Sequence, residues 1–220
     1  VKTKKAATIK DVQLYGIEFD REIFALACAN MLIHKDGKTN LEQLDTRSQE
    51  ACDWIKAKSY KTDKKGKFKK DRNGNLVLTN NYITKVLMNP PFERKYGCIT
   101  IVNNVLKNVP PHTKCAFILP DKKLEKDNGA KLLKHSTLEK IIKLPEKVFS
   151  EGVTTSVFIF EAGVPQNDKE IFTCYIEDDG LETVKNQGRH DIKDKRMLPS
   201  PWRWGASNPL MSSSTAYRNY

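Results

Sequence analysis

A short apolar run that stops at two prolines constrains the fold of this chain more than any other feature. Residues 85–88 have the length and composition of a buried strand, and Pro90 and Pro91 follow almost at once. Proline has no N–H for a sheet ladder and fixes its own φ angle, so the strand must stop and a loop must begin. In an open α/β sheet, ligands bind at the carboxyl ends of strands.

The loop 89–92 carries groups that suit a planar ring with an exocyclic amine, such as adenine. The side chain of Asn89 and the backbone carbonyl of Pro90 are acceptors, and Phe92 offers a flat aromatic face. The alternative is an ordinary turn whose aromatic side chain packs into a core, because Asn-Pro often opens turns. A motif this short needs the context of the whole chain.

Short apolar runs alternate with helical patterns along the chain. Strands are predicted near 12–17, 39–44, 85–88, 114–119, 138–144, 156–162 and 171–176. Helices are predicted near 21–33, 48–57, 99–109 and 124–135. This order predicts an α/β fold with a mostly parallel sheet that is covered on both faces. The last two strands are joined by a turn too short for a crossover helix, so we expect them to pair antiparallel at the sheet edge.

The length of 220 residues suits one sizeable domain. We expect a linker over 1–10, the domain over 11–178 and an extended tail over 179–220. A net charge of +11 favours a polyanionic partner such as nucleic acid. Nine basic residues crowd between 56 and 72, which indicates a surface insertion over about 56–80. This insertion is either a solvated loop or an arm that contacts phosphates.

Several classes of protein are disfavoured by composition. No run approaches the 18 apolar residues of a transmembrane helix, so no membrane partner is expected. The five cysteines are scattered, and none lies at zinc-ligand spacing from a second cysteine or a histidine. We therefore predict no metal site and a reducing, cytoplasmic compartment.

Four stretches resemble the adenine-N6 DNA methyltransferases, in particular the modification subunits of type I restriction-modification systems. They are Tyr15-Gly16-Ile17-Glu18 with the helix after it, Asn89-Pro90-Pro91-Phe92, Cys115-Ala116-Phe117-Ile118-Leu119-Pro120, and the block from Ile141 to Phe160. The resemblance covers roughly 11–165. It implies a Rossmann-like methyltransferase sheet and methyl transfer from S-adenosylmethionine to adenine N6.

The resemblance also implies catalytic roles for Asn89, Pro90, Pro91 and Phe92. Asn89 and the Pro90 carbonyl would hold both N6 hydrogens and stabilise the charge that develops on N6. Pro91 would stiffen the loop. Phe92 would stack on an adenine that has been flipped out of the duplex.

Three residues would bind the cofactor if the resemblance holds. Glu18 would bond the ribose hydroxyls, since a carboxylate at a strand end suits that task. Phe19 would lie against the cofactor's adenine, and Asp45 would accept from its amino group. For both carboxylates, surface charge or helix capping is the alternative.

Double-stranded DNA with a flipped adenine is the implied substrate, and a specificity subunit is the implied partner, with a restriction subunit as a further candidate. Two other functions stay open. One is a methyltransferase that acts on RNA adenine or protein glutamine. The other is a non-catalytic module that binds nucleic acid or a partner subunit.

One departure from the family generates a prediction. No Gly-x-Gly occurs in the 220 residues, although the family's Gly-rich cofactor loop lies just upstream of the strand expected at 12–17. We expect the chain to be an N-terminally truncated fragment that lacks the first strand and its helix. The isolated 220 residues should therefore bind S-adenosylmethionine poorly and methylate no DNA. A filter assay with labelled cofactor tests this, and robust transfer would contradict it.

Overall fold

The computed structural model describes residues 13–34, 40–92, 95, 97–125, 127–146, 148, 153–177, 181–184, 188–191 and 211–217. The chain divides into two compact units. The first unit comprises Val1–Val86 and Gly97–Thr113, and the second comprises Leu87–Tyr96 and Lys114–Tyr220. Each unit is described by itself below.

The first unit begins with a strand–helix–strand element. β1 (Gly16–Glu18) pairs in parallel with β2 (Leu41–Gln43). Between them lies α2 (Arg21–Ile33), whose bounds match the expected helix. Asp20 caps this helix, because its Oδ1 accepts from the backbone N–H groups of Glu22 and Ile23 at 2.9 and 3.0 Å. The helix buries none of its residues in the described structure.

Two helices form the core of the first unit. α3 (Gln49–Ser59) begins at its cap Ser48 and packs against α4 (Cys98–Asn108). The buried face of α4 repeats every three to four residues, which is the spacing expected for an amphipathic helix. Its buried residues are Cys98, Ile101, Val102, Val105, Leu106 and Asn108.

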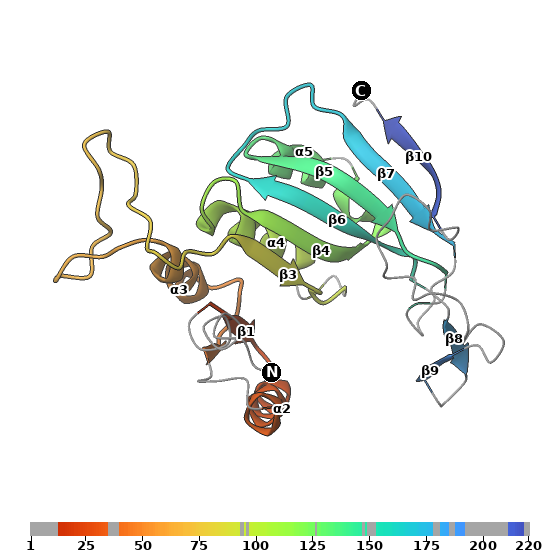
Figure 1. The fold of residues 1–220 in the computed structure, drawn as a ribbon, viewed down its shortest axis with the longest axis horizontal. Coiled ribbons are helices and arrows are strands. Elements are labelled where there is room, and N and C mark those ends of the chain that lie inside the picture. The colour runs from red at the N-terminus through yellow and green to blue at the C-terminus, as the bar shows by residue number, and fades with distance from the viewer. Residues whose placement is uncertain are drawn as a thin grey trace, which may run out of the picture. The chain divides into compact units, whose positions relative to one another are not determined.

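The basic insertion has a defined backbone over residues 60–78, which we call the basic arm. Three β-bridges join Tyr60 to Leu78, Thr62 to Phe68 and Lys70 to Leu76. Two turns connect these bridged segments, at the positions of the Gly66 and Asn73-Gly74 turn signals. The arm leaves α3 as a pair of projecting loops (Figure 1).

A six-stranded mixed sheet has the order β10-β7-β5-β6-β4-β3 (Figure 1). Its strands are β3 (Lys85–Met88), β4 (Lys114–Pro120), β5 (Ser136–Lys143), β6 (Thr155–Ala162), β7 (Ile171–Ile176) and β10 (Met211–Tyr217). β5 runs parallel to β7, and β6 runs antiparallel to both β4 and β5. β10 pairs antiparallel with β7 and forms one edge. A separate hairpin joins β8 (Leu181–Val184) and β9 (Gly188–Asp191).

The expected pairing of 156–162 with 171–176 is wrong. β5 lies between β6 and β7 and pairs with both. The eight residues 163–170 are enough to cross over one strand, although they are too few for a helix. Four of the eight residues of β5 are buried, and a strand on each side satisfies the backbone N–H and C=O groups of this central strand.

One face of β4 and β6 carries the core of the second unit. Alternate residues of β4 are buried, and Phe117 and Phe160 are completely so. Their rings meet edge to face at 6.1 Å between centroids. The helix expected over 124–135 is divided into η2 (Asp121–Leu124) and α5 (Asp127–Leu133), and Leu132 of α5 is buried.

None of the five cysteines, all of which lie in the described residues, forms a disulfide. Cys115 on β4 is fully buried, and burial raises the pKa of its thiol to about 12. A thiol in that environment stays protonated and is a poor nucleophile. In the part of the chain that the structure describes, no helix has the length and apolarity needed to cross a membrane.

Gly129 provides a test of the close packing around α5. A Cβ at this position would lie 2.2 Å from the backbone oxygen of Leu124. Replacing glycine by alanine at an exposed helix position normally stabilises the fold by roughly 1 kcal/mol. At Gly129 the clash should make the same substitution destabilising. We expect Gly129→Ala to lower the free energy of unfolding by about 1–3 kcal/mol, measured by urea denaturation. Asn128→Ala, exposed on the same helix, is the control and should not destabilise the chain.

Candidate functional site

The carboxyl ends of β1 and β2 bring the three expected cofactor residues to one place in the first unit. Glu18 is the last residue of β1 and is level with Gln43 of β2. The backbone N–H of Leu44 donates to the Glu18 carbonyl at 3.1 Å, which continues the pairing toward Asp45. Parallel pairing therefore places the side chains of Glu18, Phe19 and Asp45 at the same end of two neighbouring strands.

Glu18 and Phe19 differ in their burial and in their contacts with the rest of the protein. Glu18 is half-buried, and its Oε1 accepts from the backbone N–H of Asp20 at 2.8 Å. Its second oxygen makes no hydrogen bond within the described residues. Phe19 is 58% exposed, so part of its ring surface is accessible to a ligand.

Asp45 is engaged by Arg47, a residue that the sequence alone did not single out. The Arg47 guanidinium contacts both carboxylate oxygens, with Nε at 2.9 Å from Oδ1 and a terminal nitrogen at 2.6 Å from Oδ2. The hydrogen bond from Arg47 holds the pKa of Asp45 below its usual value. The Asp-x-Arg spacing was visible in the sequence, but spacing alone does not say whether two side chains meet.

Arg47 also links the other groups at this end of the unit. Its guanidinium carbon lies 5.7 Å from the centroid of the Phe19 ring, a cation–π distance. Asn104 of α4 donates to the carbonyls of Thr46 and Arg47 at 3.1 and 3.3 Å, which anchors the loop. Arg47 thus positions both Phe19 and Asp45.

The loop 89–92 follows β3, as expected, and belongs to the second unit. The expectation that this strand is buried is wrong, because none of its residues is buried and Leu87 is 86% exposed. Asn89 and Pro91 are exposed, Pro90 is buried and Phe92 is half-buried. The Asn89 carboxamide has no hydrogen-bond partner among the described residues, so its oxygen is available to a ligand. Because this loop and the Glu18 group belong to different units, their association in one site stays a prediction.

A charged cluster that the sequence did not reveal lies where β4 ends. Asp121 follows Pro120, accepts from Ser156 Oγ at 2.7 Å and forms an ion pair with Lys143. Burial acts to raise the pKa of Asp121, but hydrogen bonds from Lys143 and Ser156 outweigh it and hold the pKa below its usual value. The cluster ties the ends of β4, β5 and β6 together.

Comparison with known proteins identifies the family. A sequence profile described as N-6 DNA Methylase matches residues 1–199. The chain belongs to this family. The type II restriction enzyme and methyltransferase RM.BcgI of Heyndrickxia coagulans is 28% identical to this family member over 196 residues. That match covers 82% of the chain and 27% of RM.BcgI, so the chain spans about a quarter of this relative's length.

Solved structures share the fold of this N-6 DNA methylase family member. The M protein of the type I restriction enzyme EcoKI is 16% identical, with a TM-score of 0.54 over 83% of this chain and 39% of that protein. The methyltransferase subunit of a Streptococcus thermophilus type I system is 16% identical, with a TM-score of 0.53 over 82% and 39%. A Listeria monocytogenes protein assigned to the class I S-adenosylmethionine-dependent methyltransferases is 17% identical, with a TM-score of 0.52 over 76% and 50%. The expected α/β methyltransferase fold is therefore confirmed.

The Asp121 cluster generates a pH-dependent prediction. A carboxyl whose folded pKa is depressed stabilises the fold above its unfolded pKa of about 4, and this stabilisation is lost as the pH falls through the folded value. Asp121→Asn should lower the free energy of unfolding by about 1 kcal/mol at pH 7, since the pair is partly exposed. The difference from the unmodified chain should shrink below about pH 4.

Urea titrations between pH 3 and pH 7 measure this difference. Asp168→Asn is the matched control, because Asp168 is exposed and lies in a turn rather than at a helix N-terminus. An equal loss for both variants at pH 7 would contradict a specific role for Asp121.

Proposed function

We propose that this chain takes part in methyl transfer from S-adenosylmethionine to adenine N6 in DNA, as part of a restriction-modification system. The observation that carries the proposal is the loop 89–92. An exposed Asn89 with an uncommitted carboxamide stands at the carboxyl end of a strand, in a chain that belongs to the N-6 DNA methylase family.

The residues at the ends of β1 and β2 fit the nucleoside part of S-adenosylmethionine. The free oxygen of Glu18 suits two adjacent ribose hydroxyls, and the exposed ring of Phe19 suits the face of a purine. Asp45 fits less freely, because Arg47 already occupies both of its oxygens. Each carboxylate oxygen has a second lone pair, so an adenine amino group remains an acceptable donor to Asp45. The cofactor supplies an electrophilic methyl group.

The proposed contribution of the loop is electrostatic. Adenine N6 is a poor nucleophile because its lone pair is delocalised into the ring. The Asn89 side-chain oxygen and the Pro90 carbonyl would accept the two N6 hydrogens and favour localisation of the lone pair on N6. As N6 gains positive charge during the transfer, acceptors already in place stabilise the transition state. The N6–methyl bond would form as the methyl–sulfur bond breaks, which leaves a neutral thioether. N6 would then lose one proton to solvent, so no general base with an unusual pKa is needed for this step.

Pro91 and Phe92 would complete the binding of the target base. Pro91 has a fixed φ angle and lowers the conformational entropy lost when the loop orders around a ligand. Phe92 would stack on the flipped adenine and offset an unstacking cost of a few kcal/mol. The intact protein would act on duplex DNA with a specificity subunit, and with a restriction subunit as a further candidate partner.

Substitution of Asn89 tests the proposed function. In the natural full-length protein with its partner subunits, Asn89→Ala should lower the rate of methyl transfer to duplex DNA by about 10²-fold or more, since one preorganised partner of the reacting group is lost. Affinity for DNA should be largely unchanged. Incorporation of labelled methyl groups and fluorescence anisotropy with the same duplex measure the two quantities.

Asn128→Ala is the matched control, because it removes an exposed carboxamide from α5. An Asn89→Ala protein that retains full transfer would contradict a catalytic role and favour a non-catalytic binding module. Parallel assays with single-stranded RNA and with a glutamine peptide test the other methyl acceptors. The inactivity expected of the isolated 220 residues stays a prediction.

A further inference from the structure

The basic arm, residues 60–78, is built from an eight-residue repeat. The turn sequence Asp63-Lys64-Lys65-Gly66-Lys67 is repeated eight residues later as Asp71-Arg72-Asn73-Gly74-Asn75. Three short bridged segments alternate with these turns, and each begins with an apolar residue: Tyr60, Phe68 and Leu76. The segments form a closed ring of backbone hydrogen bonds. Lys69 N–H donates to the Lys61 carbonyl at 2.8 Å, Val77 to Lys69 at 3.0 Å and Lys61 to Val77 at 2.8 Å.

The two turns of the arm have the same geometry. Asp63 Oδ1 accepts from the N–H groups of Lys65 and Lys67 at 2.8 and 2.9 Å. Asp71 Oδ1 accepts from those of Asn73 and Asn75 at the same two distances. Gly66 and Gly74 have φ angles of +78° and +84°, which favour glycine. The arm therefore presents its side chains from a defined backbone.

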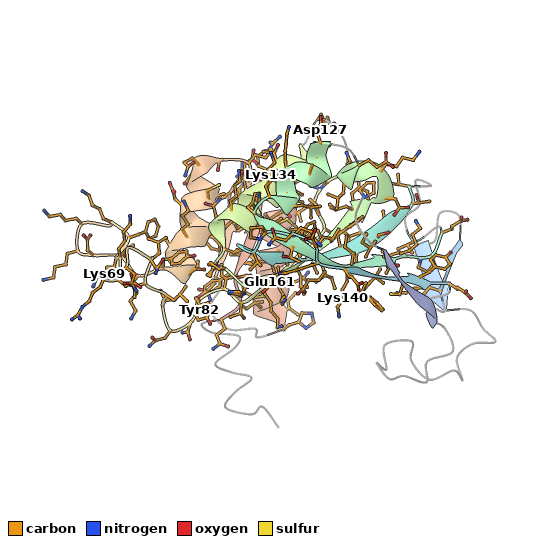
Figure 2. All side chains as sticks on the ribbon, turned by 90° about the horizontal axis from the view of Figure 1, so that it is seen from above. Lys69, Tyr82, Asp127, Lys134, Lys140 and Glu161 are labelled. Atoms are coloured by element: carbon orange, nitrogen blue, oxygen red, sulfur yellow. The ribbon has the colours of Figure 1, made fainter. Side chains whose placement is uncertain are left out.

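The two aspartates of the arm accept backbone hydrogen bonds within the turns, and they form no ion pairs with the cations of the arm in the described residues. Hydrogen bonds led by the one from Asn75 N–H hold the pKa of Asp71 below its usual value. Seven cations lie between residues 60 and 78 against these two aspartates, a net charge of +5 out of +11 for the whole chain. All seven are exposed, and none forms an ion pair within the described residues: Lys61, Lys64, Lys65, Lys67, Lys69, Lys70 and Arg72. Figure 2 shows Lys69 and its neighbours projecting outward.

The base of the arm is concave. An open pocket of about 400 Å³ is lined by Lys58 and Lys61 together with Thr79, Asn80 and Asn81. Two ammonium groups beside two carboxamides are donors suited to phosphate and sugar oxygens. Lys58 is held in place by the rings of Tyr15 and Trp54, at 5.4 and 4.8 Å.

We propose that the basic arm binds the phosphate backbone of duplex DNA. The choice of DNA as ligand rests on the proposed function, since a target adenine lies within a polyanion. A protein partner is disfavoured by the surface of the arm, because lysine is depleted in protein–protein interfaces. The two aromatic side chains of the arm pack on each other: Tyr60 is buried, and its ring centroid lies 6.4 Å from that of the half-buried Phe68. The contacts would be independent of sequence and would position the duplex without reading its bases.

The dependence of DNA affinity on salt concentration tests this inference. In the natural full-length protein, substitution of Lys64, Lys65, Lys67 and Arg72 by Gln removes four charges without touching the backbone ring. We expect affinity for a duplex of about 30 base pairs to fall by tenfold or more at low salt. The slope of log K against log salt should fall by about 0.9 for each phosphate that the variant no longer neutralises. Fluorescence anisotropy between 50 and 300 mM KCl measures both.

A second variant guards against an indirect effect of the substitutions. In this variant, the dipeptide Asn-Gly replaces residues 61–77 and connects Tyr60 directly to Leu78. These two residues form an antiparallel β-bridge, so a two-residue turn can join them. This variant should weaken duplex binding at least as much. The matched control replaces four exposed lysines outside the arm, Lys107, Lys122, Lys131 and Lys134, by Gln, and should change the slope less.

The outcomes separate this inference from the proposed function. Arm variants that bind duplex with unchanged affinity and slope, in a protein that methylates DNA, would overturn the inference and leave the function standing. Loss of assembly with a protein subunit at unchanged duplex affinity would also overturn it. Arm-dependent duplex binding by a protein that transfers no methyl group would uphold the inference and remove the proposed function.

Discussion

The cross-strand packing of β4 on β6 is the interaction on which the second unit depends. Phe117 and Phe160 are completely buried and meet edge to face, and the two strands stay in register along their whole length. This register sets where β4 ends, at Pro120, and therefore where Asp121 meets Lys143 and Ser156. β3 lies on the other side of β4, so the same sheet also supports the strand that presents Asn89.

In the first unit, a shorter sheet must hold the residues that follow its strands in place. Its two paired strands have only three residues each, too few to hold a loop by themselves. The contacts of Arg47 with Asp45 and Phe19, and those of Asn104 with the backbone at 46–47, supply the missing constraint. Arg47, which the sequence did not single out, thus contacts two of the residues that the sequence predicted to bind the cofactor.

Much of this organisation was predictable because it depends on neighbours in the chain. Proline at 90 and 91 ends β3, Asp20 caps α2, and glycine at 66 and 74 makes the turns of the arm. Contacts between distant residues were not predictable in the same way. The position of β5 between β6 and β7, the partner of Asp45 and the Asp121 cluster all join segments whose attraction depends on the whole fold.

The sequence by itself determined the end of β3, the loop 89–92 and membership of the N-6 DNA methylase family, because proline chemistry, periodicity and motif order are local properties of the chain. Only the tertiary structure decided that Asn89 is exposed with an uncommitted carboxamide, that Arg47 holds Asp45, and that the basic insertion is a ring of three bridged segments. Exposure and pairing depend on which surfaces the fold buries, and no local pattern specifies that.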